Sequence, residues 1–112
     1  NSKKLYMKKI EEVRSQLLAG QFEFTQHAFK RAVERNISET EIKQIAEEAK
    51  IIEEYPDDKY SPSALLLGFT EEKRPLHLQV SLADSDMIKI ITLYEPDKSE
   101  WTDDFERRRQ ND

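Results

Sequence analysis

The chain has 112 residues, of which 37% are charged and 37% hydrophobic, and its formal net charge is −5 at pH 7. This length and balance predict one small, strongly solvated domain, and the acidity argues against a protein that coats nucleic acid by bulk charge, although a local basic patch remains open. Without cysteine there is no disulfide or thiolate metal site, and no apolar run approaches the ~20 residues of a membrane span. We therefore expect a cytoplasmic protein that uses no metal or other cofactor.

Helical periodicity and end signals predict three helices in residues 1–49. The first is expected to span residues 3–19, where apolar residues recur at helical spacing. Ser38 and Glu41 form a capping box that opens the third helix, which we expect to end near Ala49. The residues of these two helices expected in the core are Leu5, Ile10, Val13, Leu17, Leu18, Ile42, Ile45 and Ala46.

The second predicted helix carries the most distinctive polar face of the chain. Thr25 is a suitable N-cap, and Asn36 tolerates the left-handed backbone that follows many helix ends. His27, Arg31 and Arg35 are four residues apart, so they share one face. One titratable group beside two fixed cations suits phosphate binding, although a solvated face with a capping histidine would show the same pattern. The apolar residues expected to face the core are Ala28, Phe29, Ala32 and Val33.

From Lys50 onward, extended segments alternate with turn residues, which predicts an antiparallel meander in residues 50–96. The four predicted strands are residues 51–55, 63–70, 75–82 and 87–94. Residues 97–112 form a tail, with a short helix expected from about Thr102 to Arg109. Helices followed by hairpin-linked strands predict a single α+β domain over residues 1–112, with the helices on one face of the sheet.

The turns of the meander suggest a register. If residues 84–85 form a two-residue loop, His77 pairs with Thr92, and if residues 72–73 form another, His77 pairs with Gly68. The apolar face then consists of Leu65, Leu67, Phe69, Leu76, Leu78, Val80, Leu82, Ile91 and Leu93. The polar face consists of Gly68, His77, Gln79, Ser81, Thr92 and Tyr94.

This register predicts that His77 stands in mid-sheet on the polar face. Gly68 would leave space beside it for a ligand, and Thr92 would orient its ring. The simpler interpretation is that this polar face of the sheet is only exposed to solvent and that His77 has no functional role. The register also has a cost, because it places Ile88 and Ile90 on the polar face, and Lys89 on the apolar one.

Five sequence blocks, in this order along the chain, indicate a resemblance to a known family. They are F-T-Q-H-A-x2-R-x3-R-x-I-S from Phe24, I-I-E-x-Y-P-x-D from Ile51, R-P-L-H from Arg74, I-I-T-x-Y-x-P from Ile90 and W-x3-F-x2-R-R from Trp101. The match that they define spans nearly the whole segment from residue 24 to residue 109. The chain thereby resembles the small bacterial family called domain of unknown function 4258.

The resemblance implies a fold, an activity and partners. Members are often encoded beside a small zinc-finger antitoxin, and they look like distant relatives of the BrnT and RelE ribonuclease toxins, in which helices pack on a small antiparallel sheet. It therefore implies the toxin of a bacterial type II toxin–antitoxin pair, with RNA and a zinc-finger antitoxin as partners. The positions that match the motifs are His27, Arg31, Arg35, His77, Thr92, Tyr94 and Trp101. The acidic composition departs from that of a strongly basic toxin.

The residues are compatible with metal-free RNA cleavage. This reaction needs a base for the 2′-hydroxyl, an acid for the leaving oxygen, and cations or donors for the charge that develops at phosphorus. His27 and His77 are candidates for the two proton-transfer roles, while Trp101 and Tyr60 offer faces on which a base could stack. The catalytic candidates are His27, Arg31, His77, Thr92 and Tyr94, and the RNA-binding candidates are Arg35, Trp101, Arg107, Arg108 and Arg109.

A non-enzymatic function is an alternative to RNA cleavage, for two reasons. If all helices cover one face of the sheet, His27 lies across the sheet from His77, and the two could meet only at a sheet edge or end. A non-catalytic binding or regulatory module, whose basic groove receives an antitoxin or an acidic peptide, would use the same surface.

Overall fold

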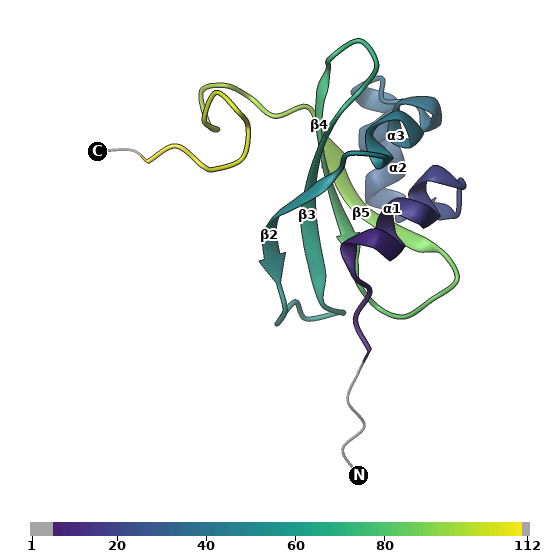
Figure 1. Cartoon of the computed structure of the whole chain (residues 1–112). Coiled ribbons are helices and arrows are strands. Elements are labelled where there is room, and N and C mark those ends of the chain that lie inside the picture. The colour runs from purple at the N-terminus through teal and green to yellow at the C-terminus, as the bar shows by residue number, and fades with distance from the viewer. Residues whose placement is uncertain (1–5, 111–112) are drawn as a thin grey trace.

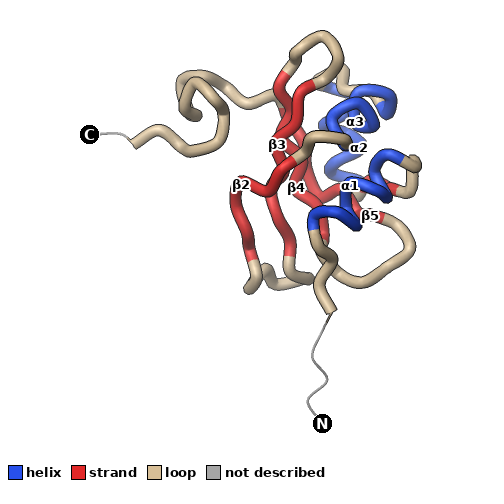
Figure 2. The backbone as a smooth tube through the Cα atoms, viewed as in Figure 1, coloured by secondary structure: helices blue, strands red, loops and turns tan. Residues whose placement is uncertain are grey.

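The computed structural model describes residues 6–110, which form three helices and a five-stranded sheet (Figures 1 and 2). The helices are α1 (Ile10–Leu18), α2 (Gln26–Glu34) and α3 (Glu39–Ala46). The strands are β1 (Phe22–Phe24), β2 (Lys50–Tyr55), β3 (Ser63–Phe69), β4 (Pro75–Ser81) and β5 (Ile88–Tyr94). All three helices lie on one side of the sheet, which confirms the predicted α+β class. No helix in the described part of the chain has the length and apolar character needed to cross a membrane.

The sheet is mixed, with the strand order β1-β5-β4-β3-β2. Strands β2 to β5 form the predicted antiparallel meander. Strand β1 pairs in parallel with β5, where the sequence predicts only a short link before the central helix. A strand of three residues carries too few positions for alternation to be visible, so its pairing is decided by the tertiary structure.

Capping residues set both ends of α2 and the start of α3 as the sequence predicts, whereas α3 ends at Ala46 and not near Ala49. The amide of Ala28 donates to Thr25 Oγ1 at 3.0 Å, and Asn36 has a left-handed φ of 57° just beyond α2. The capping box of Ser38 and Glu41 is also present at the start of α3. Helix α1 is shorter than predicted because it begins at Ile10, and residues 3–5 of the prediction lie outside the described part of the chain.

The main core lies between the helices and the sheet. Ile42 and Ile45 of α3 and Val13 and Leu17 of α1 are buried there, as predicted, but the same prediction is wrong for Leu18, which is 55% exposed. Helix α2 contributes Ala28 and Ala32, but the prediction that Phe29 and Val33 also face the core is wrong, since these side chains are 59% and 65% exposed. Helix α2 packs on β5, and its buried residues are the two small alanines, whereas its larger apolar side chains reach solvent.

The predicted β3–β4 register is wrong by one residue. Leu66 pairs with Leu78 and Leu67 pairs with His77, because residues 70–74 form the turn instead of residues 72–73 alone. Within this turn the amide of Thr70 donates to the Arg74 carbonyl at 2.9 Å. A slip of one residue reverses every side chain of β3, so Leu65 and Leu67 lie on the face opposite Leu66.

Gly68 faces the main core and does not make room beside His77. A Cβ atom at this position would lie 2.5 Å from Ile45 Cβ and 2.9 Å from the Ile45 carbonyl oxygen. The absence of a side chain therefore allows α3 to approach β3 closely, which is a packing role.

The β4–β5 register also differs from the prediction. His77 pairs with Tyr94, Gln79 pairs with Thr92, and an irregularity follows between Gln79 and Val80. A bulge of this kind changes the facing of the residues beyond it. Consequently Ile88 and Ile90 are fully buried in the main core, although the predicted register placed them on the polar face. Lys89 is exposed.

The predicted C-terminal helix is absent from residues 102–109. After β5 the chain crosses to the side of the sheet opposite the helices and curls there as an irregular segment, which we call the C-terminal cap (residues 97–109; Figure 1). Its two ends meet at a bridge between Trp101 and Arg108, and Phe105 has a left-handed φ of 62°. A second apolar cluster under the cap consists of Leu65, Leu67, Trp101 and Phe105.

Candidate functional site

His77 is fully buried beneath the C-terminal cap, which contradicts the expectation of an open histidine on a polar face. Its Nε2 lies 2.9 Å from the carbonyl oxygen of Phe105, and its Nδ1 lies 3.2 Å from the hydroxyl of Tyr94. A carbonyl only accepts, so Nε2 carries the proton and donates to Phe105. Nδ1 of the neutral ring then accepts from Tyr94.

The surroundings of His77 favour its neutral form. Burial lowers the pKa of His77 from its ordinary value of 6.5, while the Phe105 carbonyl and Glu53 oppose the shift and Arg108 adds to it. The Trp101 ring meets the imidazole edge to face, with 4.4 Å between the ring centroids. His77 is therefore a neutral proton acceptor at pH 7 that reaches solvent only through its neighbours.

We expect this buried histidine to make stability depend on pH below about 6.5. Because the pKa of His77 is lower in the folded chain, the unfolded chain binds a proton first as the pH falls. The free energy of unfolding should thus be highest above 6.5 and should decrease as the pH drops through the lowered pKa. Urea denaturation at pH 7.5, 6.5 and 5.5 measures this loss.

The matched variant for the pH experiment is His77→Gln, whose amide can still donate to the Phe105 carbonyl but does not titrate. It should lose less stability than the parent protein between pH 6.5 and 5.5, because the carboxylates common to both proteins contribute equally. His27→Gln, at an exposed position, serves as the control. Equal losses in the parent and His77→Gln would show that this histidine is not the titrating group.

The cap also covers Trp101, which is 2% exposed. Arg108 lies over the outer face of the indole, with its guanidinium carbon 4.7 Å from the ring centroid. The same guanidinium donates from Nε and Nη2 to both carboxylate oxygens of Glu53, at 3.0 and 3.2 Å. The stacking surface that the sequence suggested for Trp101 is therefore covered, and Arg108 is held in place by a bidentate ion pair.

Beside the cap lies an open cleft of about 650 Å³, which we call the arginine cleft. The residues that line it are Arg35, Arg74, Tyr94, Glu95, Asp97, Glu100, Trp101 and Arg108. Tyr94 is one of the lining residues, and its hydroxyl contacts the buried His77. Burial raises the pKa of Tyr94, so the phenol is protonated at neutral pH. The cleft thus joins three cations to a tyrosine that is hydrogen-bonded to a neutral histidine.

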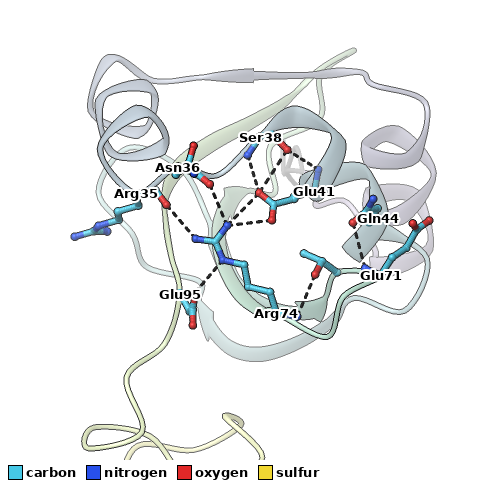
Figure 3. Close-up of polar contacts among 9 residues, drawn as sticks. Arg35, Asn36, Ser38, Glu41, Gln44, Glu71, Arg74 and Glu95 are labelled. Carbon is cyan, nitrogen blue, oxygen red and sulfur yellow. Dashed lines mark hydrogen bonds and ion pairs between the residues drawn. The ribbon is translucent and has the colours of Figure 1, made fainter.

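Of the three cleft arginines, Arg74 has a structural role (Figure 3). Its guanidinium donates to Glu41 at 3.0 Å, to Glu95 at 2.8 Å, and to the carbonyl oxygens of Arg35 and Asn36, both at 3.0 Å. It therefore ties the start of β4 to the end of α2 and the start of α3. The sequence did not reveal this role, because the partners on the two helices lie 33 to 39 residues away along the chain.

Arg35 is the least restrained cation of the cleft. Its Nη1 donates to the carbonyl oxygen of Leu93 at 3.0 Å, and its guanidinium points away from the Arg74 cluster in Figure 3. A guanidinium has five N–H donors in a planar fork. The contacts of Arg35 among the described residues use one of them, so the others are available to an anion in the cleft.

His27 and Arg31, the other two predicted residues of the central helix, have different surroundings. His27 Nε2 is 3.5 Å from Thr92 Oγ1, and both side chains reach solvent. Arg31 forms an exposed ion pair with Glu34 at 2.9 Å. His27 thus meets Thr92, whereas His77 meets Tyr94, and no described hydrogen bond joins the two histidines. The predicted residues therefore form two separate pairs, His27 with Thr92 and His77 with Tyr94, whose β5 members are two residues apart.

The three consecutive arginines of the tail have different environments. Arg109 donates to Asp103 at 2.8 Å and to the Lys98 carbonyl at 2.7 Å, whereas Arg107 is exposed. Together with Thr102 and Gln110 they surround a second, shallow cleft on the cap. Within residues 6–110, no three His, Cys, Asp or Glu side chains are grouped so that they could hold a metal ion.

A family model described as "Domain of unknown function (DUF4258)" matches residues 24–95. The matched segment runs from the end of β1 to the residue after β5 and leaves the C-terminal cap outside. It contains both residue pairs of β5 and the positions His27, Arg31 and Arg35. Comparisons with curated proteins and with solved structures gave no significant match.

Proposed function

The chain belongs to the DUF4258 family, and we propose on that premise that it is a metal-independent endoribonuclease, the toxin of a bacterial type II toxin–antitoxin pair. The observation that carries the proposal is the position of Tyr94. This phenol faces a cleft with arginines on one side, and its hydroxyl is hydrogen-bonded to the neutral His77 on the other. A proton acceptor beside phosphate-binding cations is the arrangement that transesterification of RNA requires.

The proposed reaction uses Tyr94 and His27 on opposite sides of the scissile phosphate. Tyr94 accepts the proton of the 2′-hydroxyl while its own proton passes to Nδ1 of His77. The 2′-oxygen then attacks phosphorus, the bond to the 5′-oxygen breaks, and His27 in its protonated form donates to that oxygen. The products are a 2′,3′-cyclic phosphate and a 5′-hydroxyl. His77 does not touch RNA and is a positioning residue.

The spacing along β5 suits these two roles. Thr92 and Tyr94 are two residues apart on one face of the strand, a separation of about 7 Å. His27 lies beside Thr92, so an acid and a base can flank one phosphodiester. Arg35 supplies planar N–H donors for the charge on phosphorus. The exposed pair of Arg31 with Glu34 contributes little to stability, so a phosphate can replace the carboxylate.

One observation favours a second candidate, a non-catalytic binding module. Arg74 and Arg108 already have carboxylate partners, which reduces the positive charge available to RNA. A partner would then bind mainly to the row of His27, Arg31 and Arg35. An antitoxin of the zinc-finger type or an acidic peptide would fit this row whether the protein cleaves RNA or only binds a partner. Its affinity should fall as salt concentration rises.

Incubation of the purified protein with defined RNA in EDTA tests the proposed function. We expect cleavage to persist without divalent ions and to leave cyclic phosphate or 3′-phosphate ends, because the 2′-hydroxyl is the nucleophile. Lys9→Ala, at an exposed position on the helical side of the chain, is the control for altered surface charge. Products with 3′-hydroxyl ends would indicate hydrolysis by metal-activated water, and uncleaved RNA would support the binding module.

A further inference from the structure

Another cavity, of about 300 Å³, lies at the other end of β5, and we call it the Tyr60 pocket. The residues that line it are Thr25, Asp58, Tyr60, Ser61, Ser81, Lys89 and Ile91. They come from the β2–β3 loop, the end of β4, the beginning of β5 and the residue that caps α2. The proposed reaction uses none of them.

The Tyr60 pocket and the arginine cleft are joined by one strand. Lys89 and Ile91 line the pocket, Thr92 meets His27, and Tyr94 lines the cleft. Ile91 and Tyr94 are three residues apart, or about 10 Å along β5. A chain that lies along this strand would therefore pass from the pocket to the proposed reaction site without crossing the C-terminal cap.

The lining of the pocket suits a nucleobase better than a phosphate. The Tyr60 side chain is 91% exposed, an unusual position for an aromatic ring that has no described packing partner. Ser61 and Ser81 hydroxyls lie 2.9 Å apart on the wall and offer further hydrogen bonds. The Asp58 carboxylate accepts from Ser63 at 2.8 Å and from the Tyr60 amide at 3.3 Å, so a negative charge is fixed in the pocket. This carboxylate can accept from the amino group of a base, whereas an ionised phosphate has no donor to offer it.

We propose that the Tyr60 pocket is a nucleobase subsite and that single-stranded RNA is the substrate class of this protein. The proposal rests on the proposed function, because it places the base on the same RNA strand whose phosphate occupies the arginine cleft. An exposed tyrosine binds a base by stacking on its face, which requires a base that is not already stacked in a duplex. Lys89, whose ion pair with Glu23 is long at 3.7 Å and exposed, is available to the adjoining phosphate.

Binding of 2′-O-methyl oligonucleotides to the full chain tests the subsite without cleavage, since the nucleophile is blocked. The probes are a dinucleotide and a hexanucleotide of adenine and cytosine, and a twelve-base-pair duplex. We expect the hexanucleotide to bind more tightly than the dinucleotide, and Tyr60→Ala to weaken it about tenfold. Tyr60→Phe should bind as the parent does, because it keeps the ring face. Tyr6→Ala, at a half-exposed tyrosine before α1, is the matched control.

The outcomes separate the subsite from the proposed function. If Tyr60→Ala binds the hexanucleotide as tightly as the parent, or if the parent binds neither single strand, the subsite is refuted. Duplex binding as tight as that of the hexanucleotide would refute single-stranded RNA as the substrate class. If Tyr60 is needed for binding but natural RNA stays intact in EDTA, the subsite is supported and the proposed ribonuclease fails.

Discussion

Tyr94→Phe is expected to slow RNA cleavage by about 10²–10⁴-fold, the usual loss when one general acid–base group is removed. The substitution keeps the aromatic ring between β5 and the cap but deletes the hydroxyl that joins the arginine cleft to His77. The fold should survive, because the ring stays partly buried and only one hydrogen bond is lost. Single-turnover cleavage of a defined RNA measures the effect, and thermal unfolding checks the fold.

Two further variants sharpen this result. His77→Gln should reduce cleavage by a similar factor, since it removes the acceptor for the Tyr94 proton while keeping the donor to Phe105. Lys9→Ala should cleave as the parent does. If Tyr94→Phe cleaves RNA at the parent rate, the phenol has no part in the reaction. A large loss in His77→Gln alone would then mean that the histidine acts by shaping the cap.

The second large effect is expected from Gly68→Ala, which should destabilise the protein by about 1–3 kcal/mol through overpacking. The added methyl group would lie 2.5 Å from Ile45 Cβ and 2.9 Å from the Ile45 carbonyl oxygen, so the backbone of α3 itself would have to move. Urea denaturation at pH 7.5 measures the change in the free energy of unfolding.

Gly20→Ala provides the comparison for this experiment. At Gly20 the nearest atoms to a new Cβ are the flexible end of Lys43, at 3.1 and 3.3 Å, and the penalty comes mainly from a φ of +78°. We expect this variant to lose about 1 kcal/mol, the cost of a left-handed backbone for alanine. A Gly68→Ala protein as stable as the parent would mean that α3 shifts on β3 at little cost.

Local signals in the sequence predicted both ends of α2, the start of α3 and four of the five strands. Thr25, Ser38 and Asn36 act through contacts within a few residues of themselves, so their roles do not depend on the rest of the fold. The alternation of residues 75–82 likewise gave the facing of β4 correctly, with Leu76 and Leu78 in the main core. These features are set by residues that lie close together in the sequence.

The strand register and the arrangement of the site depend on contacts between residues far apart in the sequence. The sequence predicted these two features less well. The turn at residues 70–74 and the irregularity after Gln79 each change the pairing by one residue, and neither has a distinctive sequence. The sequence selected His27, His77 and Tyr94 as candidates, but it did not predict that His77 is buried. This burial is produced by Phe105 and Trp101 of the C-terminal cap, which has neither helical nor strand periodicity.

The position of the cap in the chain has a consequence for shortened forms of the protein. All five strands end before Trp101 and Phe105, so a chain that stops after β5 keeps every strand of the sheet. Such a chain would carry His77 and Tyr94 on a sheet face open to water, without the carbonyl that fixes the imidazole tautomer. The neutral, oriented histidine therefore depends on a segment that lies outside the residues matched by the family model.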